Sequence, residues 1–154
     1  MVGKGTLASI AAAFLTLLAV GVATAAQPQR EPSLFEDFTI EGVCGFPVLF
    51  QATANKEYFT EFEDGRVQVN GKFKVVLTNT LTGTSLALNA SGPALLAPVE
   101  RYRGRSLVLL FSFDTGGPGM VLTTGRVDIL RAEDGSIVSM ETHGSTVDVC
   151  AALA

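Results

Sequence analysis

Hydrophobic and polar positions alternate with a period of two through most of the chain after residue 37. Phe73, Val75 and Leu77, for example, alternate with Lys72 and Lys74. A β-strand with one buried face has this spacing, because successive side chains point to opposite sides. No stretch after the first 25 residues keeps a helical period over three turns. The same alternation, or a short apolar run, predicts strands at 38–41, 46–50, 58–62, 67–69, 73–77, 86–88, 107–113, 127–130, 137–140 and 147–149.

Glycine follows a short polar residue or a histidine at most of the breaks between these segments. Such pairs tolerate the positive φ angles of tight hairpin turns. The pairs are Asp64-Gly65, Asn70-Gly71, Thr82-Gly83, Asp134-Gly135 and His143-Gly144. The pattern predicts an all-β antiparallel domain of about 8–10 short strands. We favour a barrel or barrel-like closed sheet, with a β-sandwich as the alternative.

The N-terminus has a different pattern, that of a secretory signal peptide. Lys4 supplies a positive charge, residues 7–22 carry none, and Ala23-Thr24-Ala25 is a small-x-small cleavage signal. A membrane span needs about 20 apolar residues, so an uncleaved anchor fits less well. We therefore predict a signal peptide over residues 1–25, cleavage after Ala25 or Ala26, and a secreted, extracellular protein.

The remaining chain is long enough for one domain. Residues 26–33 contain two prolines and no periodicity, which predicts a flexible linker before a single all-β domain over 34–154. Loss of Lys4 with the signal peptide leaves 10 Lys and Arg against 15 Asp and Glu, a net charge near −5. Nucleic acids and anionic membranes attract basic surfaces. Neither is expected as a partner, and no membrane span is expected after cleavage.

The chain has two cysteines, Cys44 and Cys150, near the two ends of the strand-rich region. Export places them in an oxidising compartment, so we predict that they form a disulfide, with two free buried thiols as the alternative. The closed loop is worth about 4–5 kcal/mol in the chain-entropy model. Joining the first and last parts of the β region also favours a closed sheet. With one histidine and no Cys-x-x-Cys pair, the sequence predicts no metal site, and it contains no cofactor motif.

The sequence Asp114-Thr115-Gly116 follows an apolar strand, as in aspartic proteases, where two carboxylates share one proton. The next residues, Gly117-Pro118-Gly119, are typical of a turn and not of the strand that supports such a dyad. We interpret Asp114 as a loop residue and predict no catalytic residue here. On this interpretation an Asp114→Asn variant keeps its fold.

Three further features have a structural and a functional interpretation. His143 beside Gly144 is typical of a solvated turn residue, and no nucleophile motif accompanies it. The acidic cluster Glu57, Glu61, Glu63 and Asp64 lacks the dense ligand loop of calcium sites, so we interpret it as a solvated face. Alternating arginines, which an extended strand presents on one face, favour either an anion-binding patch or a charged edge. They are Arg101, Arg103 and Arg105.

Short motifs along the chain resemble those of a group of small secreted β-proteins of unknown function from actinobacteria. The motifs are CGFPV at 44–48, TNTLTG at 78–83, SGP at 91–93, LTTGR at 122–126 and DVCAALA at 148–154. They are structural in character and span nearly the whole exported part. The resemblance implies export and a β-domain. It implies no activity and no catalytic or binding residues.

Three classes of function remain open on the sequence. The favoured one is an extracellular binding or interaction module without catalysis, whose partner is a small apolar ligand, a glycan or a protein. The alternatives are a structural or envelope-associated protein and an enzyme of isomerase or cyclase type without a sequence motif. A cavity of roughly 300 Å³ or more with a few polar groups favours binding or catalysis, whereas a filled interior favours the structural alternative.

Overall fold

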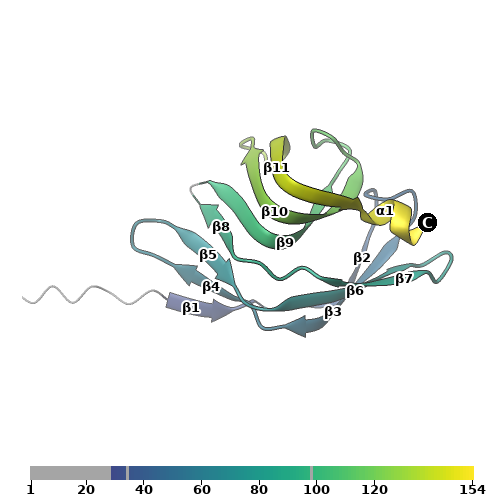
Figure 1. Cartoon of the computed structure of the whole chain (residues 1–154), viewed down its shortest axis with the longest axis horizontal. Helices are drawn as coiled ribbons and strands as arrows, with labels where there is room; N and C mark the ends of the chain where they lie inside the picture. Colours follow the sequence, from purple (N-terminus) through teal and green to yellow (C-terminus); the bar gives the residue numbers. More distant parts are fainter. Residues whose placement is uncertain (1–28, 34, 98) are drawn as a thin grey trace, which may run out of the picture.

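The structure is a computed structural model that describes residues 29–33, 35–97 and 99–154. The predicted signal peptide and its cleavage site at Ala25 or Ala26 lie outside these residues. The described residues form antiparallel sheets and one short helix (Figure 1). The elements are β1 (Gln29–Pro32), β2 (Phe38–Ile40), β3 (Val48–Asn55), β4 (Tyr58–Glu61), β5 (Val67–Asn70), β6 (Phe73–Asn79), β7 (Ser85–Asn89), β8 (Ala94–Ala97), β9 (Glu100–Leu110), β10 (Gly119–Arg131), β11 (Ile137–Asp148) and α1 (Val149–Leu153).

The strands pair into two open sheets that share a core. The larger sheet has the order β1-β4-β5-β8-β9-β10-β11, and the smaller has the order β2-β3-β6-β7. Phe50 and Leu77 of the smaller sheet belong to the same buried cluster as Met120 and Leu122 of the larger one. The predicted all-β antiparallel fold is confirmed. No closed barrel is found among the described residues, and the arrangement is compatible with the sandwich alternative.

The first strand occupies part of the segment predicted as a flexible linker. Gln29–Pro32 pairs antiparallel with β4, and Pro32 lies opposite Tyr58. This strand is at the edge of the larger sheet, where a proline is tolerated because an edge residue can lack its N–H donor. The linker expectation over 26–33 therefore does not hold for residues 29–32.

Three of the five predicted glycine turns connect paired strands. Gly65, Gly83 and Gly135 have φ angles of 80°, 78° and 87° and lie in the β4–β5, β6–β7 and β10–β11 connections. Gly71 instead follows β5 of the larger sheet and leads into β6 of the smaller one. The pair His143-Gly144 lies within β11, so its interpretation as a turn is wrong.

A row of glycines crosses three neighbouring strands of the larger sheet. Gly104, Gly125 and Gly144 lie opposite one another in β9, β10 and β11, with φ angles of 83°, 117° and 155°. Glycine adopts such angles at little steric cost. All three strands can therefore bend at one level, and they curve strongly in Figure 1.

The bend packs one face of the larger sheet against itself. Val121 and Ile129 lie on the same face of β10 and would be about 26 Å apart in a straight strand. Both nevertheless join one apolar cluster with Val108 and Val127. This second cluster is separate from the core that the two sheets share.

The predicted disulfide is present between Cys44 and Cys150, with their Cα atoms 5.4 Å apart. Cys44 lies in the loop after β2 of the smaller sheet, and Cys150 lies on α1, directly after β11 of the larger sheet. The bridge therefore joins the two sheets and does not close a single sheet on itself.

The sequence predicted a strand over 147–149, and residues 147 and 148 are indeed the end of β11, but the helix α1 begins at Val149. Asp148 is the N-cap of α1 and accepts the backbone N–H of Ala151 at 3.0 Å. Val149 and Leu153 are fully buried in the shared core, and the side chain of Asn79 donates to the Leu153 carbonyl at 3.0 Å. Among the described residues, no helix has the length and apolar character needed to span a membrane.

Candidate functional site

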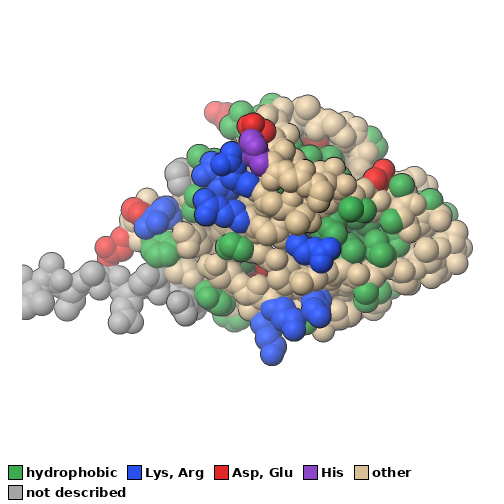
Figure 2. All heavy atoms as spheres, in the orientation of Figure 1, with side chains coloured by type: hydrophobic (Ala, Val, Ile, Leu, Met, Phe, Trp, Pro, Cys, Tyr) green, Lys and Arg blue, Asp and Glu red, His purple; other side chains and the backbone are tan. Residues whose placement is uncertain are grey.

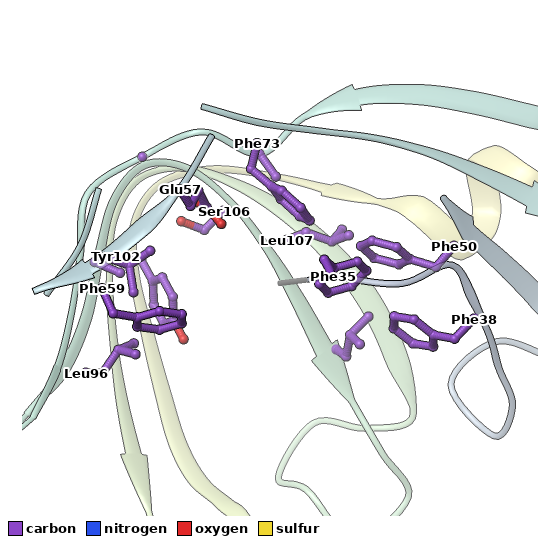
Figure 3. A pocket seen from close by; sticks show the side chains of 15 residues that line it. Phe35, Phe38, Phe50, Glu57, Phe59, Phe73, Leu96, Tyr102, Ser106 and Leu107 are labelled. Atoms are coloured by element: carbon purple, nitrogen blue, oxygen red, sulfur yellow. The ribbon is translucent and has the colours of Figure 1, made fainter. Parts of the chain in front are cut away.

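A cavity of about 320 Å³ lies between the two sheets, and its walls are almost entirely apolar (Figure 3). The smaller sheet and the segment before it contribute Phe35, Phe38, Phe50 and Phe73. The larger sheet contributes residues of β4, β5, β8 and β9. A cavity of this size is large enough for a small organic molecule.

The aromatic wall is a consequence of the alternation in β2, β3 and β6. The ring of Phe38 stacks on that of Phe50 with centroids 5.1 Å apart. Phe35 contacts Phe38, Phe50 and Phe73, with centroid distances between 5.1 and 5.4 Å. Phe35 and Phe38 keep 39% and 42% of their surface exposed. These two rings therefore lie where the cavity meets solvent.

Several residues that line the cavity are small. They are Ala90, Gly92 and Ala94. A Cβ at Gly92 would collide with the backbone carbonyl of Arg103, so this close approach to β9 requires glycine. Larger side chains at Ala90 or Ala94 would reduce the space that a ligand needs.

Glu57 is the one carboxylate among the described lining residues, and no Lys, Arg or His of that set lines the cavity. It lies in the short connection between β3 and β4. Its backbone N–H donates to Asn55, but no hydrogen bond or ion pair from the described part of the chain reaches its carboxylate. Burial raises the pKa of the Glu57 carboxyl above its usual value. Glu57 is half-buried at the cavity, whereas Glu61, Glu63 and Asp64 are exposed, as the interpretation of the acidic cluster as a solvated face expects.

Ser106 is the second polar group of the cavity whose side chain has no partner. It is 7% exposed, and its Oγ makes no hydrogen bond with the described residues. Every fully buried polar side-chain atom in that part of the chain has a hydrogen-bond partner. The Ser106 hydroxyl is therefore accessible, and it can accept or donate a hydrogen bond to a bound molecule.

Tyr102 also lines the cavity, but its hydroxyl is already engaged. It donates to Glu100, whose carboxylate also accepts two hydrogen bonds from Arg131. Burial and the neighbouring Glu100 raise the pKa of Tyr102. Burial alone would raise the pKa of Glu100, but the hydrogen bonds from Arg131 and Tyr102 hold it below its usual value. This network fixes Tyr102 as a wall of the cavity.

The three arginines singled out in the sequence lie on one face of β9, as the alternation predicts. Arg101 forms an ion pair with Asp128, whereas Arg103 and Arg105 have no ion-pair partner in the described part of the chain. Arg103 lies directly opposite Arg126 of β10. Figure 2 shows Lys and Arg side chains gathered beside the histidine on this face.

Carboxylates neutralise part of this basic face. Asp128 also pairs with Arg126 at 3.2 Å, and the hydrogen bond and charge of Arg101 lower the pKa of Asp128. His143 Nε2 lies 2.8 Å from a guanidinium nitrogen of Arg126 and 3.3 Å from a carboxylate oxygen of Glu141. These contacts are across or along paired strands, so the charges form a ladder on this face, where Arg101 and Arg103 also line a hollow of about 210 Å³.

Asp114 is a structural residue of the loop between β9 and β10. It is 7% exposed, and its two carboxylate oxygens accept the backbone N–H groups of Phe111 and Ile137, each at 2.7 Å. These bonds lower the pKa of Asp114, with the bond from Ile137 as the largest cause. Asparagine cannot accept with both of its side-chain atoms. The expectation that Asp114→Asn leaves the fold unaffected therefore has no support in this geometry.

The sequence did not identify the cavity, because its walls come from strands far apart in the chain. Among the residues described, no three His, Cys, Asp or Glu side chains are grouped so that they could hold a metal ion. No protein-family model, curated protein or solved structure matches the chain. The function is therefore inferred from this chain's own side chains.

Proposed function

We propose that this protein is an exported binding protein that holds a small apolar molecule in the cavity between its two sheets, without catalysing a reaction. The observation that carries the proposal is the cavity of about 320 Å³, with aromatic walls and only a few polar groups. Ligand sites in proteins are typically of this kind, with apolar walls and few polar groups that orient the ligand.

The cavity favours this function over a purely structural one. A protein whose task is only to be stable gains by filling its interior, because each void loses packing contacts. Here Ala90 and Ala94 occupy wall positions where larger side chains would reduce the space. A barrel-like closure, which the sequence favoured, is not needed for such a ligand, since the two sheets already flank it.

Export supports an extracellular site of action. The N-terminal pattern predicts a signal peptide, and the Cys44–Cys150 disulfide is typical of proteins that fold in oxidising compartments. The resemblance to small secreted actinobacterial proteins is consistent with the same location. N-terminal sequencing of protein from the culture medium should give Ala26 or Gln27 as the first residue. Intact Met1 in the membrane fraction would contradict export.

The binding function is tested with a neutral fluorescent probe, N-phenylnaphthylamine, whose emission rises in apolar surroundings. The wild-type protein should bind it. Leucine at Ser106 or at Ala94 should fill the cavity and weaken that binding by tenfold or more, about 1.4 kcal/mol. Two filling variants are used because either one alone can disturb folding.

Ser139→Leu is the matched control, since it adds the same side chain to an exposed position of β11 that does not line the cavity. It should bind the probe as the wild type does. Equal binding by the wild type and by folded Ser106→Leu and Ala94→Leu variants would contradict the proposal. Native mass spectrometry of protein from culture medium should then identify any molecule that stays bound.

A further inference from the structure

The two unpartnered polar groups of the cavity point to the chemistry of its ligand, and this inference rests on the proposed binding function. Figure 3 shows Glu57 and Ser106 on the side of the cavity away from Phe38 and Phe50. The end of the cavity that carries Glu57 and Ser106, here called the polar end, also carries the rings of Phe59 and Tyr102, and the other end carries those of Phe35, Phe38 and Phe50. A ligand that satisfies both ends has an apolar body and a polar head.

The polar end is negatively charged when Glu57 is ionised. No cationic side chain among the described lining residues compensates that charge. A carboxylate accepts hydrogen bonds and cannot donate them when ionised, so it requires a donor as its partner. Charge-assisted hydrogen bonds are the strongest of these interactions. A carboxylate or phosphate head would instead be repelled, and a neutral head would leave the charge uncompensated.

We propose that the cavity is a site for a small organic amine, whose ammonium group donates to the Glu57 carboxylate and to the Ser106 hydroxyl while its apolar body packs against the phenylalanines. The aromatic faces contribute as well, because the negative face of an aromatic ring attracts a nearby cation. Partial burial of Glu57 raises the pKa of its carboxyl, and a bound ammonium group compensates for the lost hydration.

The test compares three ligands that share one apolar body and differ in the head: octylamine, octanol and octanoate. Isothermal titration calorimetry at neutral pH should show that octylamine binds about tenfold or more tightly than octanol. Octanoate should bind more weakly than octanol. Binding of octanol without any preference for octylamine would overturn the amine proposal and leave the binding function standing. If none of the three binds, the proposed function itself fails.

Glu57→Gln is the decisive variant, and Glu61→Gln on the exposed side of neighbouring β4 is its matched control. In Glu57→Gln the ratio of octylamine to octanol affinity should fall to about one, because the charge-assisted hydrogen bond is lost. In Glu61→Gln the ratio should stay that of the wild type. A preference for octylamine that survives in folded Glu57→Gln would overturn the assignment.

The pH dependence provides a second readout that a merely structural role of Glu57 would not change. The affinity for octylamine should fall as the pH drops through the pKa of Glu57, because the protonated carboxyl no longer attracts an ammonium group. The raised pKa places this loss at a higher pH than for an exposed glutamate. The octanol affinity should not fall in this range. A parallel loss for both ligands would overturn the proposal.

Discussion

The carboxylate of Asp114 accepts the backbone N–H of Ile137, which lies 23 residues further along the chain, at 2.7 Å. Asp114 belongs to the loop that enters β10, and Ile137 is the first residue of β11. The two meet because β10 bends back at Gly125. This hydrogen bond therefore ties together the two ends of the bent part of the larger sheet.

Asp114→Asn should lower the melting temperature by roughly 5–10 °C. The asparagine amide would place an N–H group against one of the two backbone N–H groups that the carboxylate now accepts. Differential scanning calorimetry provides the measurement. Glu133→Gln is the control, because Glu133 is exposed in the neighbouring hairpin and shows no contact that the substitution would break. An unchanged melting temperature in Asp114→Asn would contradict a structural role.

The same carboxylate should contribute to acid sensitivity. Its pKa is lower in the folded state, so its stabilising effect is complete above the unfolded pKa of about 3.9 and is lost as the pH falls through the folded value. The melting temperature of the wild type should therefore drop below about pH 4. The difference between wild type and Asp114→Asn should shrink over that range, and a difference that stays constant to pH 2 would refute this origin.

Gly125→Ala should destabilise the protein by about 2 kcal/mol or more. The backbone of Gly125 has a φ of 117°, and a Cβ there would collide with the carbonyl of His143. Gly119→Ala on the same strand is the control, since a Cβ at Gly119 meets no atom within 4 Å. Chemical denaturation should separate the two variants. Equal stability of both would show that the bend does not depend on glycine.

The sequence pattern predicted those strands that have one buried face and one exposed face. Alternation identified β2, β3, β5, β6 and β7, because in each strand one face meets the core and the other meets solvent. In β6, for example, Val75 and Leu77 are buried and Lys74 is exposed. The positive φ expected at Gly144 is also present. Whether such a glycine makes a hairpin or a bend depends on Gly125 across the sheet, which local sequence does not reveal.

The prediction from sequence missed or shortened the strands whose two faces are both covered by other side chains. In β10, Met120 and Leu122 pack into the core that the sheets share, while Val121 packs on the cluster inside the bend, so the strand lacks alternation. The cavity was not predicted for a related reason. Its walls come from β2, β3, β4, β5, β6, β8 and β9, and only tertiary structure brings Glu57 near Phe35 and Ser106.

Arg103→Glu should stabilise the protein slightly, by about 0.2–1 kcal/mol at low salt. Arg103 now faces Arg126 across β9 and β10, and like charges at directly opposed positions repel. A glutamate at position 103 would form a pair of opposite charges with Arg126. The gain should vanish in 1 M salt, because salt screens exposed charges. Arg103→Gln should give a smaller gain, and a loss of stability in Arg103→Glu would show that Arg126 is already neutralised by Asp128.

Glu57→Gln should melt at the same temperature as the wild type at pH 7, or at a higher one. Burial raises the folded-state pKa of Glu57, so the ionised carboxylate destabilises the fold above that pKa. The penalty should disappear below about pH 4, where the carboxyl is protonated in both states. Melting curves over this pH range provide the measurement. A lower melting temperature at pH 7 would mean that Glu57 is needed for folding and not for a ligand.

The disulfide should be the strongest single stabilising element of the fold. It joins Cys44 of the smaller sheet's first loop to Cys150 on α1, across a sequence separation of 106 residues. Linking such distant positions removes many conformations of the unfolded chain. The Cys44→Ala, Cys150→Ala double variant should lose about 2–5 kcal/mol, which lowers the melting temperature by about 10 °C or more. Wild type measured in excess reductant is the control and should melt close to the double variant.

Thiol labelling of the denatured, unreduced wild type should detect no free thiol, whereas two reactive thiols per chain would refute the bridge.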